Sequence, residues 1–223
     1  MIPFTTAEFL RVFEQYNDAV WPGHAVLYLA GLIAIVLAFK RNAAAGKIVS
    51  LILALLWLWM GVVYHLIFFT KINNAARLFG AIFIIQSLVF IHASVFSSKL
   101  SFRFRFDAQG LIGVVFITYA LLVYPAIGMA VGHNYPASPT FGVPCPTTIF
   151  TFGLLIGAAV NLRLYMLMIP ILWSVMGLWA AISLGMYEDL GLAVAGLTAV
   201  LIMLRHRSMI SLRYSNDPLT PMV

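Results

Sequence analysis

The sequence has 223 residues, of which 63% are hydrophobic and only 9% are charged. A soluble domain usually carries about 25% charged residues, so a water-soluble fold of this length would lack the polar side chains to cover its surface. The net charge of +6 would fit nucleic acid in a soluble protein. Here the basic residues lie in short loops between apolar blocks, where they set membrane orientation, and no nucleic-acid partner is expected.

The apolar blocks predict an all-α, polytopic transmembrane bundle. They are about 18–22 residues long, which is the length that a helix needs to cross about 30 Å of hydrocarbon. Runs such as residues 25–39 do not alternate between apolar and polar positions, which excludes the strands of a transmembrane barrel. We therefore expect residues 1–223 to form a single membrane domain embedded in the lipid bilayer.

Residues 1–20 are expected to form an interfacial amphipathic helix, helical from residue 5 to residue 19. Thr5 and Glu8 have the spacing of a capping box. One face of this helix carries Phe9, Val12, Phe13, Tyr16 and Val20. A helix with one apolar and one charged face lies in the plane of the membrane interface.

About seven spans follow, which form a transmembrane bundle over residues 22–204 and leave 205–223 as a cytoplasmic tail. We place the spans at residues 22–39, 48–69, 75–96, 110–131, 145–161, 164–185 and 188–204. The uncharged segment 132–146 is rich in proline and aromatic residues, so it is expected to dip into the bundle. The alternative is a six-span chain in which 145–161 is re-entrant.

The distribution of lysine and arginine predicts an outside N-terminus and an inside C-terminus. Of the 13 basic residues, ten lie in the first, third and fifth loops and in the C-terminal tail: Lys40, Arg41, Lys47, Lys99, Arg103, Arg105, Arg163, Arg205, Arg207 and Arg213. The opposite side contains Arg11, Lys71 and Arg77. An odd number of spans is needed to keep this bias.

Two further patterns concern helix packing. Leu-Trp-x-x-Met-Gly occurs at 56–61 and again at 172–177. It favours two parallel three-helix units joined by the fourth span, a 3+1+3 plan like the parallel repeats of some transporters, with coincidence as the alternative. Small residues at four-residue spacing, such as Gly153 and Gly157, allow close helix contacts, either within the bundle or between copies in a homo-oligomer.

Most of the reactive side chains are predicted to gather at the outer side. By the predicted topology, six of them form the candidate substrate-binding pocket: His24, His65, His133, Cys145, Glu188 and Asp189. Ionisable residues within a membrane are costly and usually face a cavity or a partner. We therefore expect an outward-facing polar pocket, whose candidate metal ligands are Cys145, His65 and His133.

Each of these residues also has a purely structural interpretation. Cys145, the only cysteine, is expected at the N-cap of the fifth span with Pro146 at N1, where the helix dipole favours a thiolate; it is otherwise a buried thiol in a turn. His65 is either a proton carrier or part of an aromatic belt. Glu188 and Asp189 either bind a cation or cap the last span.

Several segments resemble a family of bacterial multi-pass membrane proteins of unknown function. The resemblance is carried by LLWLWMGVVYH (55–65), PTFGVPCPTTIFTFGLL (139–155) and EDLGL (188–192), and it extends from Pro-Phe-Thr-Thr (3–6) to the last span. It implies a location in the bacterial cytoplasmic (inner) membrane. It implies no activity, no cofactor and no site residue.

Three functions fit these observations. The first is a small secondary transporter or permeation protein for a cation or small polar solute. It is driven by a gradient, because the chain has no nucleotide-binding motif. The second is a membrane enzyme acting on a lipid or quinone-like substrate, with Cys145 or His65 as the reactive group. The third is a sensor or accessory subunit. The hydrolase and nucleotide motifs sought are not found, which disfavours an enzyme, and no catalytic residue or cofactor is assigned.

Overall fold

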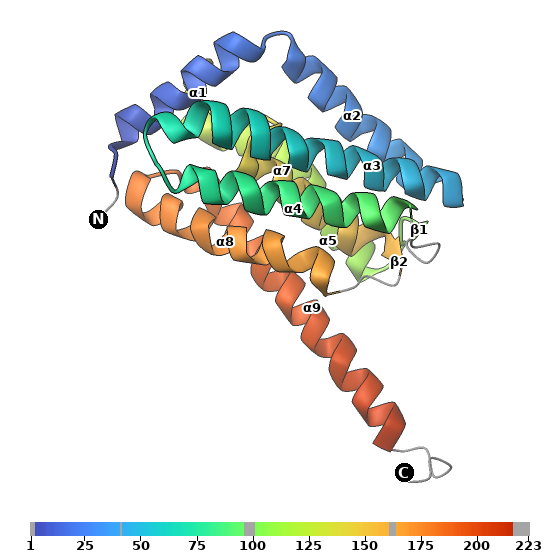
Figure 1. Ribbon diagram of the computed structural model, residues 1–223. Helices are drawn as coiled ribbons and strands as arrows, with labels where there is room; N and C mark the ends of the chain where they lie inside the picture. Colours follow the sequence, from blue (N-terminus) through green and yellow to red (C-terminus); the bar gives the residue numbers. More distant parts are fainter. Residues whose placement is uncertain (1–2, 41, 96–100, 161–163, 216–223) are drawn as a thin grey trace.

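Helices occupy all the segments that the sequence assigns to the membrane (Figure 1). The computed structural model describes residues 3–40, 42–95, 101–160 and 164–215, with the backbone alone for 95, 101, 160 and 206–215. Its helical segments are α1 (Thr6–Val20), α2 (Gly23–Ala38), α3 (Ala43–Trp59) with η1 (Met60–Phe68) and η2 (Phe69–Lys71), α4 (Ala76–Val95), α5 (Ala108–Thr118) with η3 (Tyr119–Val123) and α6 (Tyr124–Ala130), α7 (Pro144–Ala158), α8 (Tyr165–Leu184), η4 (Tyr187–Asp189) and α9 (Leu190–Ser215). The described chain is therefore all-α apart from two short strands.

Five of these segments are long and apolar enough to cross a bilayer: Ala43–Lys71, Ala76–Ser94, Ala108–Ala130, Leu164–Leu184 and Tyr187–Arg205. Helices α1 and α2 pass the same test only as a pair, and the pair is bent by 89°. Helix α7 has 15 residues, about 22 Å at about 1.5 Å per residue, which is less than the hydrocarbon thickness. The protein is thus a multi-pass helical membrane protein with five or six candidate spans, fewer than the predicted count of about seven.

The outward-facing side chains of these helices are apolar. Leu122, Leu172, Ile182 and Leu197 are each more than 60% exposed. Large exposed apolar surfaces do not persist in water, so this surface is suited to lipid. This apolar surface fits the lipid bilayer, the partner that the composition predicts.

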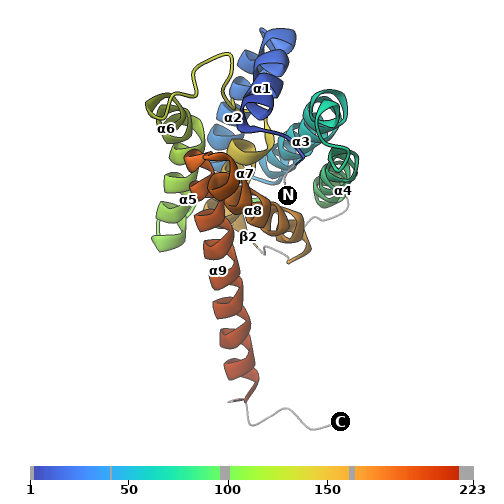
Figure 2. The same ribbon diagram turned by 90° about the vertical axis from the view of Figure 1, so that its left-hand side faces the viewer.

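Helix α7 lies in the middle of the bundle (Figure 2). All its residues except Cys145 are buried. It packs closely on α5, because glycines face each other: a Cβ placed on Gly113 would lie 2.5 Å from Cα of Gly157. The Gly153–Gly157 pair is therefore used inside the chain, as in ordinary bundle packing. The described residues need no second copy to cover it.

The C-terminal end of α7 is closed by an extended segment. Strand β1 (Ser101–Phe102) pairs antiparallel with β2 (Ala159–Val160). The N–H of Arg103 donates to the carbonyl of Ala158 at 2.6 Å, and the N–H of Phe104 donates to the carbonyl of Ala38 at 3.0 Å. Helix ends leave carbonyl groups unpaired, and burying them without partners is costly, so this segment completes α2 and α7 where water is excluded.

Helix α1 confirms the predicted amphipathic element. The side chain of Glu8 accepts from the backbone N–H of Thr5 at 2.8 Å, and the Glu8 N–H donates to the Thr5 hydroxyl at 3.2 Å, which completes the capping box. Its buried face contains Phe9, Val12, Phe13, Tyr16 and also Asn17. The helix therefore covers one end of the bundle instead of continuing the line of α2.

Candidate functional site

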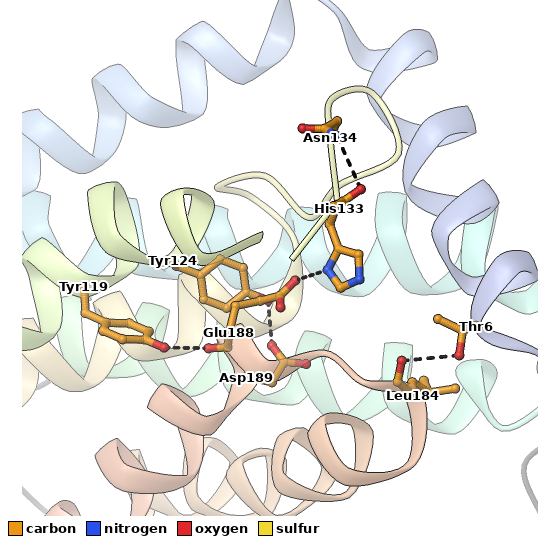
Figure 3. Close-up of polar contacts among 9 residues, drawn as sticks. Thr6, Tyr119, Tyr124, His133, Asn134, Leu184, Glu188 and Asp189 are labelled. Atoms are coloured by element: carbon orange, nitrogen blue, oxygen red, sulfur yellow. Dashed lines mark hydrogen bonds and ion pairs between the residues drawn. The ribbon is translucent and has the colours of Figure 1, made fainter. Parts of the chain in front are cut away.

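Two consecutive carboxyl groups are buried in the short turn between α8 and α9 (Figure 3). Helix α8 ends at Gly185, whose φ of 72° is a left-handed conformation that glycine adopts without strain. The turn η4 then places the Glu188 and Asp189 side chains inside the protein, where they are 0% and 2% exposed. An acidic cap at a water-exposed helix start would be solvated, so capping alone does not account for them.

Glu188 points toward the loop that follows α6. Its Oε1 accepts a hydrogen bond from Nδ1 of His133 at 2.8 Å. Its backbone carbonyl accepts a hydrogen bond from the Tyr119 hydroxyl at 2.8 Å. The second carboxylate oxygen, Oε2, is buried and has no hydrogen-bond partner. The pair joins two of the predicted pocket residues and leaves one acceptor unsatisfied.

Asp189 points the other way, toward the start of α7. The Tyr124 hydroxyl donates to its Oδ1 at 2.6 Å, and the Cys145 thiol faces the same carboxyl group. Cys145 does not occupy the predicted N-cap position: Val143 is the N-cap and Pro144 is the first helical residue. The helix starts earlier because Pro144, like Pro146, can occupy a first-turn position, where a missing N–H is harmless.

His65 is fully buried in an aromatic cage. Its ring centroid lies 4.7 Å from that of Phe83 and 5.2 Å from that of Trp173, and neither ring nitrogen has a hydrogen-bond partner. It lies in the π-helical turn η1, a rare local geometry that is frequent at functional sites. His65 therefore packs against Trp173, whose indole faces Cys145. The imidazole itself forms no hydrogen bond with Cys145, Glu188 or Asp189.

His24 belongs to a separate cluster. Its Nε2 donates to Oδ1 of Asn17 at 3.0 Å. The Asn17 amide in turn donates to the carbonyls of Pro136 and Ser138, at 2.6 and 2.7 Å. The buried Asn17 thus fastens the 132–143 loop to the corner between α1 and α2. In the sequence, Asn17 stands out only as a polar residue at the end of the apolar face of the amphipathic helix.

A small cavity adjoins the Asp189 carboxyl group. Its volume is about 60 Å³, below the range of about 300–1,000 Å³ of drug-sized pockets. It is lined by Phe4, Phe9, Phe13, Tyr64, Phe69, Asn73, Phe79, Tyr124, Pro139, Val143, Pro144, Cys145, Trp173, Met176, Gly177, Trp179, Ala180, Leu184 and Asp189. Of the six predicted pocket residues, Cys145 and Asp189 line it. His24, His65, His133 and Glu188 do not.

The predicted metal ligands are not brought together. Within the described residues, no three His, Cys, Asp or Glu side chains are placed to hold a metal ion. His65 is enclosed by rings, His133 bonds Glu188, and Cys145 faces Asp189. Protein metal sites usually need three or four such ligands, so this geometry does not support Cys145, His65 and His133 as a metal site.

The charges of the cluster do not balance. In the part of the chain that is described, ion pairs join Arg105 to Asp107, at the opposite end of the bundle, and His133 to Glu188. Neither pair neutralises Asp189. The cluster therefore has two buried carboxyl groups and one imidazole, which contacts Glu188 only. A buried carboxylate needs a counter-charge, a proton or a bound cation.

Comparison with known proteins identifies one family. The profile described as "Family of unknown function (DUF6064)" matches residues 6–213, which is most of the chain. No curated protein and no solved structure matches.

Proposed function

The chain belongs to the DUF6064 family of unknown function, and from its buried acidic cluster we propose that it binds a small cation at its outer face and carries it across the membrane. It acts as a small secondary transporter or permeation protein. The observation that carries the proposal is Asp189, a carboxyl group 2% exposed, beside a cavity and without a cationic partner among the described residues. Ionisable groups at such positions mark ion pathways and proton relays.

The proposed orientation places the cavity outside the cell. Lys40, Lys47, Arg103 and Arg105 belong to the end of the bundle where α2 and α7 finish, as the hydrogen bonds of Phe104 and Arg103 to these helices indicate (Figure 1). The cavity lies at the other end. The basic residues Arg41, Lys99 and Arg163 lie outside the described residues, as do the side chains of Arg207 and Arg213. The bias of basic residues supports a cytoplasmic location for the end of the bundle where α2 and α7 finish.

The proposal includes seven crossings. Helices α2 and α7 are short, yet each runs from the cavity end to the end where β1 and β2 pair, the same two ends that the longer helices connect (Figure 1). An odd number of crossings keeps the N-terminus outside and the C-terminus inside, as the basic residues require. The inner-membrane location and the 3+1+3 repeat stay predictions.

The enzyme alternative has less support. A catalytic cysteine is activated by an adjacent base or cation. The Cys145 thiol instead faces the Asp189 carboxyl group and the Trp173 indole. None of the three candidate histidines is hydrogen-bonded to it, because His24 and His133 have other partners and both ring nitrogens of His65 have none.

The test is cation flux into liposomes that contain the purified protein. Gradients of alkali and of ammonium cations are imposed in turn, and at least one of them is expected to give a current that Asp189→Asn abolishes and Glu188→Gln reduces at least about tenfold, because the counter-charge of the cation is lost. Glu14→Gln removes the same charge from an exposed position on α1 and is the matched control. Wild-type protein without flux for any cation, or equal flux in Asp189→Asn, would overturn the proposal.

A further inference from the structure

The cavity beside Asp189 is rich in aromatic residues. Nine of its 19 lining residues are aromatic, and among those described residues none is Lys, Arg or His. Trp173 and Tyr64 adjoin the Cys145–Asp189 end. The lining also contains Phe4, which precedes α1, and Phe9 and Phe13 on α1. The site is therefore a set of π-faces around a single carboxyl group.

This lining is unsuited to a hard inorganic cation. Alkali and alkaline-earth ions need about six oxygen ligands to replace their hydration shell. Among the lining residues, the side chains that contain oxygen are those of Asp189, Tyr64, Tyr124 and Asn73. The Tyr124 hydroxyl already donates its proton to Asp189 at 2.6 Å. A dehydrated metal ion would remain under-coordinated here.

The same lining suits an organic ammonium ion. An alkylated ammonium is weakly hydrated, and the electron-rich faces of Trp, Tyr and Phe rings attract it, most strongly where water is excluded. The cation supplies the positive charge that the acidic cluster lacks, and the Asp189 carboxyl group is its counter-charge. The Trp173 indole faces the Cys145 thiol, which itself faces this carboxyl group, so an aromatic ring and the counter-charge lie at the same end of the cavity. We infer that the cavity is a binding site for a small alkylammonium ion.

The size of the ligand follows from the cavity and from α1. A volume of about 60 Å³ admits a cation of only a few non-hydrogen atoms, such as methylated ammonium. Phe9 and Phe13 stack edge to face at 4.8 Å, and Phe13 stacks on Tyr64 at 5.7 Å. These contacts hold α1 over the cavity as its outer wall. Phe13 and its neighbours on α1 thus limit the length of the alkyl groups.

The inference rests on the proposed cation site, but its test separates the two. Trimethylammonium and the neutral, similarly shaped tert-butanol are titrated into the purified full-length protein in lipid nanodiscs, with tryptophan fluorescence and calorimetry as readouts. Trimethylammonium is expected to bind at least about tenfold more tightly than tert-butanol and potassium, because only the organic cation uses both the rings and the carboxyl group.

Variants identify the residues responsible. Asp189→Asn is expected to remove the preference for the cation over tert-butanol. Trp173→Leu weakens cation binding at least about fivefold, and Trp173→Phe, which keeps a π-face, restores most of it. Equal binding of trimethylammonium and tert-butanol, or unchanged binding in both Asp189→Asn and Trp173→Leu, overturns the inference. Asp189-dependent potassium flux without ammonium binding refutes the ligand class and keeps the transport proposal. Selective ammonium binding without flux refutes the transport proposal and keeps the ligand class.

Discussion

The hydrogen bond between Tyr124 and Asp189 allows a quantitative prediction. The Tyr124 side chain is 1% exposed, and its hydroxyl donates to Oδ1 of Asp189 at 2.6 Å. Tyr124→Phe removes this donor and little volume, so the acceptor stays buried with one partner fewer. Hydrogen bonds to charged groups contribute about 1.5–3 kcal/mol, compared with about 0.5–1.5 kcal/mol for neutral pairs. We expect Tyr124→Phe to lower the free energy of unfolding by about 1.5–3 kcal/mol.

The assay is reversible unfolding in mixed micelles, followed by tryptophan fluorescence. Tyr135→Phe deletes the same atom from a side chain that is 55% exposed, and surface changes of this kind stay within about 0.5 kcal/mol. A double-mutant cycle with Asp189→Asn is expected to show a coupling of about 1 kcal/mol or more. If Tyr124→Phe matched Tyr135→Phe, or if its effect simply added to that of Asp189→Asn, the hydrogen bond would not hold the carboxyl group in place.

Three further predictions address packing, charge and orientation. Gly113→Leu should abolish folded protein on size exclusion, because a Cβ there meets the α7 backbone at 2.5 Å; Gly23→Ala, whose Cβ has ordinary contacts, should fold normally. The backbone N–H of Gly110 and the Arg105 side chain lower the pKa of Asp107 below 3.8. Its stabilising effect is therefore present above that value and lost as pH falls through the lowered pKa, and Asp107→Asn should flatten the decline of stability below about pH 4. In a background without the native cysteine, Tyr135→Cys should react with an impermeant maleimide added outside and Phe106→Cys only with reagent added inside; the opposite pattern would invert the proposed topology.

The positions of the helices could be predicted because they depend on local properties. Apolar blocks of span length become helices wherever backbone groups have no water to pair with, and all the predicted spans are helical. The capping box of Thr5 and Glu8 is likewise a three-residue relation that survives folding. The number of spans could not be predicted in the same way, because a short apolar helix such as α7 has the same sequence pattern whether it crosses the membrane or re-enters it.

The candidate site was only partly predictable. Topology alone placed the six polar residues near one end, and the structure joins Glu188 to His133 and Cys145 to Asp189. The structure separates His24 and His65 from these four residues. His24 is hydrogen-bonded to Asn17, and His65 is enclosed by aromatic rings. Tyr124, whose hydroxyl bonds Asp189, was missed, since one tyrosine among many aromatic residues in a membrane segment carries no distinguishing signal.

The sequence by itself determined the class of the protein, its helices and the shared location of Glu188, Asp189 and His133 near one end of the bundle, because hydropathy and the length of a span are properties of consecutive residues. Only the tertiary structure decided that α7 is enclosed, that its glycines face α5, and that Asp189 borders a cavity of aromatic rings. These features depend on which faces of separate helices meet. That is set by close packing between residues far apart in the chain, such as Phe4, which precedes α1, and Leu184 on α8.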